Sequence, residues 1–381
     1  MFVFAIRFDN ITSNTNTNTN TNLNMFEKLN ISYAKLYMRT NTNRRMGVYR
    51  KLASLLRNDF NIMSALERIE STESHYGEKK NEPIAIAMRE WEKGLERGLP
   101  LSEAVRGWVP TTDMMMLTLG DVSKLSTALD NIVRVGTGMD RIKKALLDAA
   151  MYPLFLFALT FLIIIGVGVY LVPGLLSAAG TDIVFRGAAR SLVMVSDFSK
   201  HYWPFLLSGI GILMAAVWMS LPIWTGRLRT LFDNMPPWSL YKISESTGFM
   251  MSLSSMVASG ASIPVAVKLL SDNSSKYLAD ILDRMSRYMA NGDNMGVALK
   301  NTGRNFPSAE IIGDLEIYAD MNSFENNLSN IANDYMDQSV KRIESLANIL
   351  NAIGMLLVSA AIAWVVFGTF EMQGQITDAL T

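Results

Sequence analysis

Three long uncharged, apolar runs interrupt an otherwise mixed chain. They lie between Asp148 and Asp182, between Lys200 and Arg227, and between Glu344 and Glu371. Each run is longer than the roughly 20 apolar residues that a helix needs to cross about 30 Å of hydrocarbon. The pattern therefore predicts an integral membrane protein whose three spanning helices cover 150–173, 202–222 and 346–368.

Two polar segments precede the first and third runs, and they resemble each other. Residues 52–69 align with 253–270, and residues 120–132 align with 319–331 further along. Chance similarity between apolar helices explains isolated matching pairs but not matches that recur in the same order. The sequence therefore predicts a duplicated domain.

Each copy has helical periodicity. Leu52, Leu55 and Leu56 of the first copy follow the i, i+3, i+4 spacing of one apolar helix face. No segment alternates with period two for long enough to indicate a strand. Turn residues divide the first copy into predicted helices near 45–57, 61–73, 82–97, 101–107, 111–119 and 123–149, and the second into helices near 245–258, 262–272, 274–290, 295–302, 308–319 and 323–345. The fold class predicted is an all-α integral membrane protein with two homologous six-helix bundles.

The expected division of the chain follows from these patterns. A leader (1–44) contains an Asn/Thr tract at 14–22, which lacks apolar groups and is expected to be disordered. Met25 is an alternative start. The remaining parts, in chain order, are the first helical domain (45–149), span 1 (150–173), a short loop (174–201), span 2 (202–222), a linker (223–244), the second helical domain (245–345), span 3 (346–368) and a tail (369–381).

Basic residues beside the spans indicate the orientation. They precede the first and third spans and follow the second, at Arg141, Lys143, Lys144, Arg227, Arg229, Lys341 and Arg342. The tail carries no basic residue, although basic residues in the loop at 174–201 reduce the contrast. Because positive flanks stay in the cytoplasm, the N-terminus and both helical domains are expected to be cytoplasmic and the C-terminus extracytoplasmic.

Composition excludes several kinds of chemistry. The chain has 35 basic and 35 acidic residues, which argues against nucleic-acid binding. It has no cysteine and only two histidines, so thiolate sites are excluded and a zinc site is not expected. It has no phosphate-binding loop and no metalloprotease or serine-hydrolase motif. No catalytic, cofactor-binding or metal-binding residue is therefore predicted.

At this point the chain resembles the inner-membrane platform proteins of type IV pilus and type II secretion systems. The twofold repeat carries the resemblance, together with a Leu253-x-x-Met-Val-x-Ser-Gly-x-x-Ile-Pro-x-Ala266 segment, a Gly98-x-x-Leu-x-x-Ala-Val105 string and Ala149-Ala-Met-Tyr-Pro153 at the first span. Asn58-Asp59 replaces the family's Ser-Gly, and the family's Gly-Glu-x-x-Gly is altered at Asp121 and Asp320. This divergence favours a type IVb pilus branch.

The resemblance implies a function and partners. It implies a non-enzymatic platform in the bacterial inner membrane that couples a hexameric cytoplasmic assembly ATPase to pilin extraction. Pilin subunits, other inner-membrane assembly proteins, membrane lipid and further copies of the chain are the implied partners. A membrane transporter or channel component is the alternative. It is disfavoured because the spans carry no charged residue.

Seven residues are candidates for partner or cation contacts. Asp121 and Asp320 occupy equivalent points in the two copies, where a carboxylate would suit a cation or a partner's arginine. Glu103 is a second acidic candidate. Arg227, Arg229, Lys341 and Arg342 would suit the ATPase or anionic lipid. The simpler interpretations are helix N-terminal electrostatics for the two aspartates, a solvated surface for Glu103 and membrane topology for the basic residues.

Overall fold

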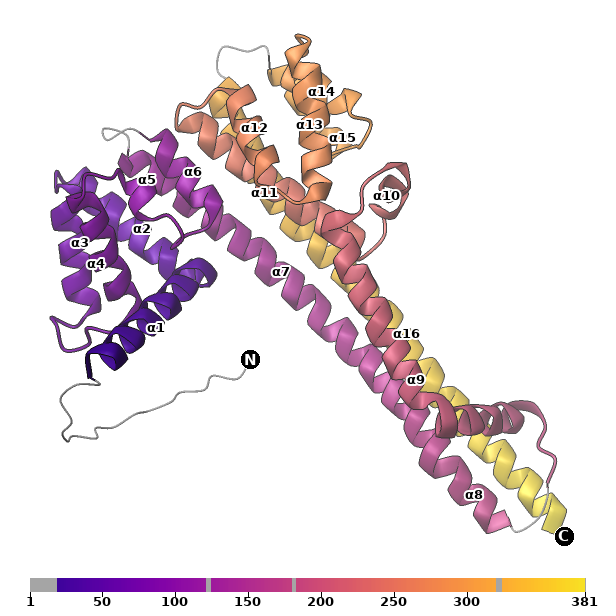
Figure 1. Cartoon of the computed structure of the whole chain (residues 1–381). Helices are drawn as coiled ribbons and strands as arrows, with labels where there is room; N and C mark the ends of the chain where they lie inside the picture. The colour runs from indigo at the N-terminus through magenta and orange to yellow at the C-terminus, as the bar shows by residue number, and fades with distance from the viewer. Residues whose placement is uncertain (1–18, 121–124, 180–182, 320–323, 381) are drawn as a thin grey trace. The chain divides into compact units, whose positions relative to one another are not determined.

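The computed structural model describes residues 19–120, 125–179, 183–319 and 324–380 (Figure 1). The chain divides into two compact units, Met1–Val133 and Arg134–Thr381, which we call unit 1 and unit 2. The described residues form helices and connections without any strand. This confirms the predicted all-α class.

Unit 1 is built around helix α4. Its helices are α1 (Thr19–Thr40), α2 (Thr42–Arg57), α3 (Ile62–Glu73), α4 (Pro83–Glu96), α5 (Leu101–Ala104), α6 (Thr111–Leu119) and the start of α7 (Leu125–Gly166). Ile84, Met88 and Trp91 recur at helical spacing on one face of α4, and all three are buried. Helices α1, α3 and α5 pack against α4. Burial of this face holds the first bundle together.

A buried ion pair joins α2 to α6 inside unit 1. Arg45 Nε lies 2.8 Å from Asp113 Oδ2, and Tyr49 donates a hydrogen bond to the same oxygen at 3.3 Å. Arg45 also donates to the Met38 carbonyl at the end of α1. Burial raises the pKa of the Asp113 carboxyl, while the Arg45 guanidinium opposes that rise. The network fixes α1, α2 and α6 to one another.

Helix α1 begins within the leader. Of the tract at 14–22 that was expected to be disordered, residues 14–18 lie outside the described residues, and residues 19–22 form the start of α1. Ala34 and Met38, which are fully buried, give the middle and end of α1 an apolar contact with the bundle. The low hydrophobicity of the tract itself does not reveal this packing further along the helix.

Unit 2 holds the rest of α7 and all later helices. These are the π-helix η1 (Val167–Leu171), α8 (Val172–Ala179), α9 (Gly187–Ile223), α10 (Arg227–Phe232), α11 (Trp238–Ala258), α12 (Ile263–Asp272), α13 (Lys276–Ala290), α14 (Met295–Asn301), α15 (Ala309–Tyr318) and α16 (Phe324–Leu380). The largest helix–helix contact joins α11 to α16. The second bundle therefore forms on a helix that continues into an apolar stretch.

The described residues contain three stretches of helix that are long and apolar enough to cross a membrane. They are Leu125–Ser177, Tyr202–Ile223 and Asn327–Ala379, and each contains one of the predicted spans. Large apolar side chains such as Phe205, Trp218 and Phe367 are exposed on them. Hydrocarbon offers no partner to a free backbone polar group, so helices with apolar surfaces suit that environment.

The glycines of the spans differ in what surrounds them. A Cβ added to Gly354 of α16 would lie 2.8 Å from Leu156 Cδ1 of α7, and one added to Gly168 of η1 would lie 2.9 Å from Ser199 Cβ of α9. By contrast, Gly166, Gly209 and Gly211 have open space at that position. Small residues in a span are compatible both with close helix packing and with ordinary span composition. The structure assigns close packing to Gly168 and Gly354.

The predicted helices recur in order in both copies. Helices α2–α7 match the six expected in the first copy and α11–α16 the six expected in the second, mostly within a few residues at each boundary. Asn61 caps α3 by accepting a hydrogen bond from the Ser64 amide at 2.8 Å. Ser262 holds the equivalent position before α12, but its side chain makes no capping bond.

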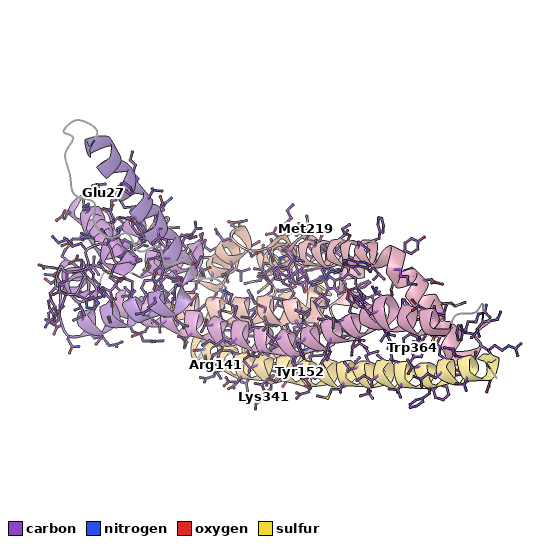
Figure 2. All side chains as sticks on the ribbon, turned by 90° about the horizontal axis from the view of Figure 1, so that it is seen from below. Glu27, Arg141, Tyr152, Met219, Lys341 and Trp364 are labelled. Carbon is purple, nitrogen blue, oxygen red and sulfur yellow. The ribbon has the colours of Figure 1, made fainter. Side chains whose placement is uncertain are left out.

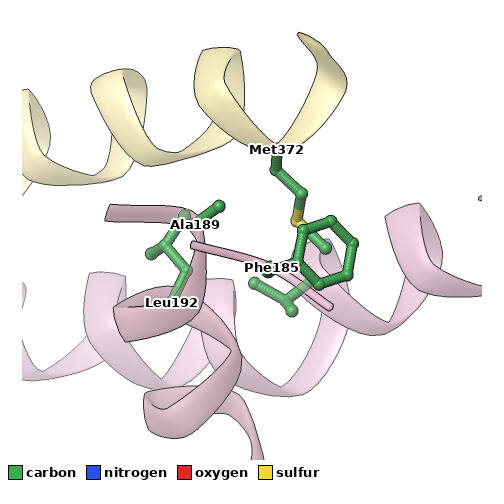
Figure 3. Close-up of a cluster of buried hydrophobic side chains, with 5 residues drawn as sticks. Phe185, Ala189, Leu192 and Met372 are labelled. Carbon is green, nitrogen blue, oxygen red and sulfur yellow. The ribbon is translucent and has the colours of Figure 1, made fainter. Parts of the chain in front are cut away.

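The connections outside the helical domains contain more helix than expected. The predicted loop at 174–201 contains most of α8 and the first turns of α9, and the predicted tail at 369–381 continues α16 to Leu380. Their buried side chains form a small core of Val172, Phe185, Ala189, Leu192 and Met372 (Figure 3). This packing between distant segments has no local signature in the sequence.

Candidate functional site

The predicted contact residues fall into different environments. Asp121 and Asp320 lie outside the described residues. Glu103 is exposed on α5 and lies 2.5 Å from the Arg106 guanidinium one helical turn away. An exposed pair of this kind adds little stability. Glu103 therefore lies where a partner can reach it.

The basic residues beside the second and third spans also lie in different surroundings. Lys341 and Arg342 are exposed on α16, and Arg342 pairs with Glu310 of α15 at 3.2 Å. Figure 2 shows Lys341 and Trp364 at separate points along α16. Arg227 is exposed at the start of α10 and lines a cavity. These three side chains are available at the surface.

Arg229 corrects the sequence-based expectation. It was predicted to meet a partner or lipid, but its side chain is fully buried beside Asp233, at 3.2 Å between Nε and Oδ1. The guanidinium lies 4.8 Å from the centre of the Tyr277 ring, and the Tyr277 hydroxyl donates to Asp233 Oδ2 at 3.1 Å. Its position near a span suggested surface charge. The turn of α10 instead directs Arg229 inward against α13.

Burial shifts the pKa values of the two charged groups in this cluster. Desolvation lowers the pKa of the Arg229 guanidinium and raises that of the Asp233 carboxyl, while each group's charge opposes the other's shift. In the described part of the chain, the guanidinium nitrogens of Arg229 make no hydrogen bond despite the ion-pair distance. The contact between the guanidinium and the Tyr277 ring offsets part of the free-energy cost of burying the charge. The cluster therefore anchors α10 to the second bundle.

A polar seam runs along the contact between α11 and α16. Ser246 Oγ lies 2.7 Å from the Tyr335 hydroxyl, and Thr247 Oγ1 donates to Ser339 Oγ at 2.9 Å. All four side chains are buried. Hydrogen bonds between buried groups are costly to separate, so the seam fixes the register of α11 on α16. In the alignment that pairs Leu52 with Leu253, Ser246 corresponds to Arg45, so the duplicated helices use different polar contacts.

Helix α7 joins the same seam. Arg134 Nη1 donates to Ser329 Oγ of α16 at 2.6 Å, and Nη2 donates to Ser255 Oγ of α11 at 3.4 Å. One helical turn later, Gly138 admits the side chains of Met251 and Met336. Arg141 then pairs with Asp337 at 3.1 Å. Thus α7 is fixed to α11 and α16 before its apolar stretch begins.

A second set of contacts joins α16 and η1 to α9 near the far ends of the first and third apolar stretches. Glu371 Oε2 of α16 accepts hydrogen bonds from the amides of Ala188 and Ala189 at 2.7 and 3.3 Å, which caps the start of α9. Trp364 Nε1 donates to Ser191 Oγ at 2.9 Å, and Trp364 packs against the buried cluster of Phe185, Ala189, Leu192 and Met372. Ser196 Oγ donates to the Gly168 carbonyl of η1 at 2.6 Å. This site was not predicted from the sequence. Gln375, one turn after Glu371, also accepts a hydrogen bond from the Arg186 amide at 2.9 Å, so the two polar residues after the third span are a local signal for it.

Two helices connect the polar domains to the apolar stretches. Helix α7 runs without interruption from Leu125 to Gly166, and α16 runs from Phe324 to Leu380. Each therefore includes both polar domain sequence and an apolar stretch. Within the described residues, no group of three or more acidic, histidine or cysteine side chains is placed to hold a metal ion. The candidate functional site is the set of contacts that lock α7, α9, α11 and α16 together.

Comparison with known proteins agrees with the twofold architecture. The family described as type II secretion system (T2SS), protein F, matches residues 48–173 and 249–370, which is one match for each copy. The toxin coregulated pilus biosynthesis protein E of Vibrio cholerae serotype O1 is 22% identical over 88% of this chain and 98% of its own length. The protein transport protein HofC homolog of Escherichia coli strain K12 is 20% identical over 75% of this chain and 74% of its own length. The chain, with its repeated domain and its membrane helices, therefore belongs to the protein F family of type II secretion and type IV pilus systems.

Proposed function

We propose that this protein is a non-enzymatic inner-membrane platform for the assembly of a type IV pilus or of the related pseudopilus of type II secretion. It would couple a hexameric cytoplasmic assembly ATPase to the extraction of pilin subunits from the membrane. The names of the two relatives, one a pilus biosynthesis protein and one a protein transport protein, support this assignment.

The continuity of α7 and α16 is the observation that carries the proposal. A helix transmits rotation or displacement along its axis because each turn is hydrogen-bonded to the next. A movement imposed on the helical domains would thus reach the apolar stretches, beside which pilin subunits would lie. The chain has no phosphate-binding loop, so the energy would come from a separate ATPase.

The proposed topology places both helical domains, 45–149 and 245–345, in the cytoplasm. Spans at 150–173, 202–222 and 346–368 would then leave the connection 174–201 and the end of the chain on the periplasmic side. Glu103, Arg227, Lys341 and Arg342 are exposed, and we assign them to contacts with the ATPase, other inner-membrane assembly proteins or lipid. Further copies of the chain would complete the platform.

Gene deletion tests the proposed function. Fibres sheared from cells are quantified by immunoblotting for pilin, and total pilin in the membrane is measured in parallel. We expect deletion to abolish the sheared fibres while membrane pilin persists, and the wild-type gene to restore them. Normal fibre yield in the deletion strain would contradict the assignment.

A pair of substitutions in α7 tests the coupling itself. Leu147 is 61% exposed, so Leu147→Pro breaks the helix without removing a buried side chain, whereas Leu147→Ala keeps it. We expect the proline variant to reach the membrane in normal amounts yet assemble few fibres, and the alanine variant to behave like the wild type. Equal fibre yields from both variants would exclude transmission through α7.

A further inference from the structure

A basic cavity lies in unit 2 beside the second span. Its volume is about 740 Å³, and it is bounded by α10, α13 and the connection after α14. Four arginines line it, Arg227, Arg284, Arg287 and Arg304, and no acidic residue belongs to the lining. Asn291 and Asn301 add amide groups to its wall. The cavity thus has several donors of positive charge.

The carboxylate of Asp280 neutralises only part of this charge. Asp280 pairs with Arg284 at 3.2 Å and with Arg304 at 2.8 Å, so two guanidinium groups share one acid. The described structure gives no ion pair to Arg227 or Arg287. The cavity therefore keeps a positive excess, which would attract an anion.

Contacts with the rest of unit 2 hold one wall of the cavity in place. The Arg304 side chain is only 10% exposed, and it also donates a hydrogen bond to the Gly226 carbonyl immediately before α10. This contact ties the loop after the second span to the bundle. Arg229, buried behind the same short helix, anchors α10 from its other side through Asp233 and Tyr277. The positions of Arg227 and Thr230 at the cavity are consequently fixed from two directions.

The location of the cavity indicates which class of ligand it favours. Helix α9 ends at Ile223, and Gly226 and Arg227 follow within one turn's length of chain (Figure 1). Arginines at this level meet the headgroup region of a bilayer, where anionic lipid attracts basic side chains. The planar guanidinium group donates paired hydrogen bonds that match the oxygens of a phosphate.

We propose that this cavity binds a phosphate group, with the headgroup of an anionic phospholipid as the source that its position favours. Arg227 and Arg287 would bind the phosphate oxygens directly. Arg304 and Arg284, held by Asp280, would form the rigid positive wall. A soluble phosphate compound offers the same chemistry and is separated from the lipid by the experiment. The inference does not depend on the proposed role in pilus assembly.

The experiment uses the full-length protein in detergent micelles and native mass spectrometry. The probes are phosphatidylglycerol, neutral phosphatidylcholine and inorganic phosphate. The double variant Arg227→Ala/Arg287→Ala removes two exposed arginines from the cavity. The matched control, Lys143→Ala/Lys144→Ala, removes the same charge from two exposed residues beside the first span. Thermal unfolding of each variant checks that the fold is kept.

We expect wild-type protein and the control to retain phosphatidylglycerol in preference to phosphatidylcholine. The cavity variant should bind phosphatidylglycerol at least about tenfold more weakly. Binding of inorganic phosphate that depends on the same arginines, without retention of phosphatidylglycerol, would support the cavity but identify a soluble source. Equal loss in the cavity variant and the control, or unchanged binding in the cavity variant, would overturn the proposal.

Discussion

Arg134 Nη1 of α7 donates a hydrogen bond to Ser329 Oγ of α16 at 2.6 Å, and this contact joins the two helices that continue into the first and third apolar stretches. The same guanidinium reaches Ser255 of α11. One arginine thus holds together the three helices on which the second bundle and two of the spans depend.

Replacing Arg134 should loosen this junction. Arg134→Ala removes charge-assisted hydrogen bonds and should lower the free energy of unfolding of unit 2 by about 1–3 kcal/mol. The exposed Arg141, which pairs with Asp337 one to two turns later, is the control, and Arg141→Ala should cost at most about 1 kcal/mol. Thermal unfolding of the two variants in detergent measures the difference. Equal losses would show that the junction is not the stronger contact.

Two glycines in one helical segment give a closely matched comparison. A Cβ on Gly168 would meet both the side chain of Ser199 and the backbone of Ser196, whereas a Cβ on Gly166 would meet nothing within 4 Å. Gly168→Ala should therefore destabilise the packing of η1 on α9 by about 1–3 kcal/mol. Gly166→Ala should be neutral or slightly stabilising because alanine favours the helix. A similar midpoint of thermal unfolding for both variants would contradict the close approach.

Glu245 should make the stability of unit 2 depend on pH. Burial raises the pKa of the Glu245 carboxyl, although hydrogen bonds from Tyr241 and Ser275 oppose the rise. A carboxyl with a raised pKa in the folded state binds its proton more tightly there than in the unfolded state. Stability is therefore lost as pH rises from about 4, the ordinary glutamate value, through the raised pKa.

The test is Glu245→Gln, which keeps the shape of the side chain and removes its titration. The variant should unfold at a higher temperature than the wild type at neutral pH, and the difference should disappear below about pH 4. Thermal midpoints measured across this range decide the point. A wild type that gains stability relative to the variant as pH rises would show the opposite sign.

The absence of cysteine allows the topology to be tested with single thiols. Ser54 and Lys268 are exposed in the two helical domains, and Gly374 is exposed near the end of α16 with open space around it. In intact cells, a membrane-impermeant maleimide should label Gly374→Cys on the periplasmic side. It should label Ser54→Cys and Lys268→Cys only after the inner membrane is permeabilised. Opposite labelling of the two domains would refute a shared cytoplasmic location.

The sequence predicted the helices well because their signals are local. Apolar spacing around Leu52, the cap at Asn61 and the uncharged runs each depend on residues within a few turns. The buried position of Arg229 could not be predicted, because it depends on Tyr277, which lies far along the chain on α13. The cap that Glu371 provides for α9 depends in the same way on packing between distant segments.

The basic cavity could not be predicted from the sequence for the same reason. Arg227 was singled out from its place beside the second span, but Arg287 and Arg304 carry no sign in the sequence that they approach it. Only the packing of α10 on the second bundle brings them to one cavity. The sequence shows which charged residues lie near a span. Only the fold shows which of them come together to line a cavity.

Capture of partners tests the central claim most directly. The full-length protein, tagged at its N-terminus, is purified in mild detergent from cells that contain the assembly ATPase and the pilin of the same system. An unrelated membrane protein with the same tag is the control. The platform account predicts that the ATPase and the pilin are both recovered with this protein and not with the control. Recovery of neither would contradict it.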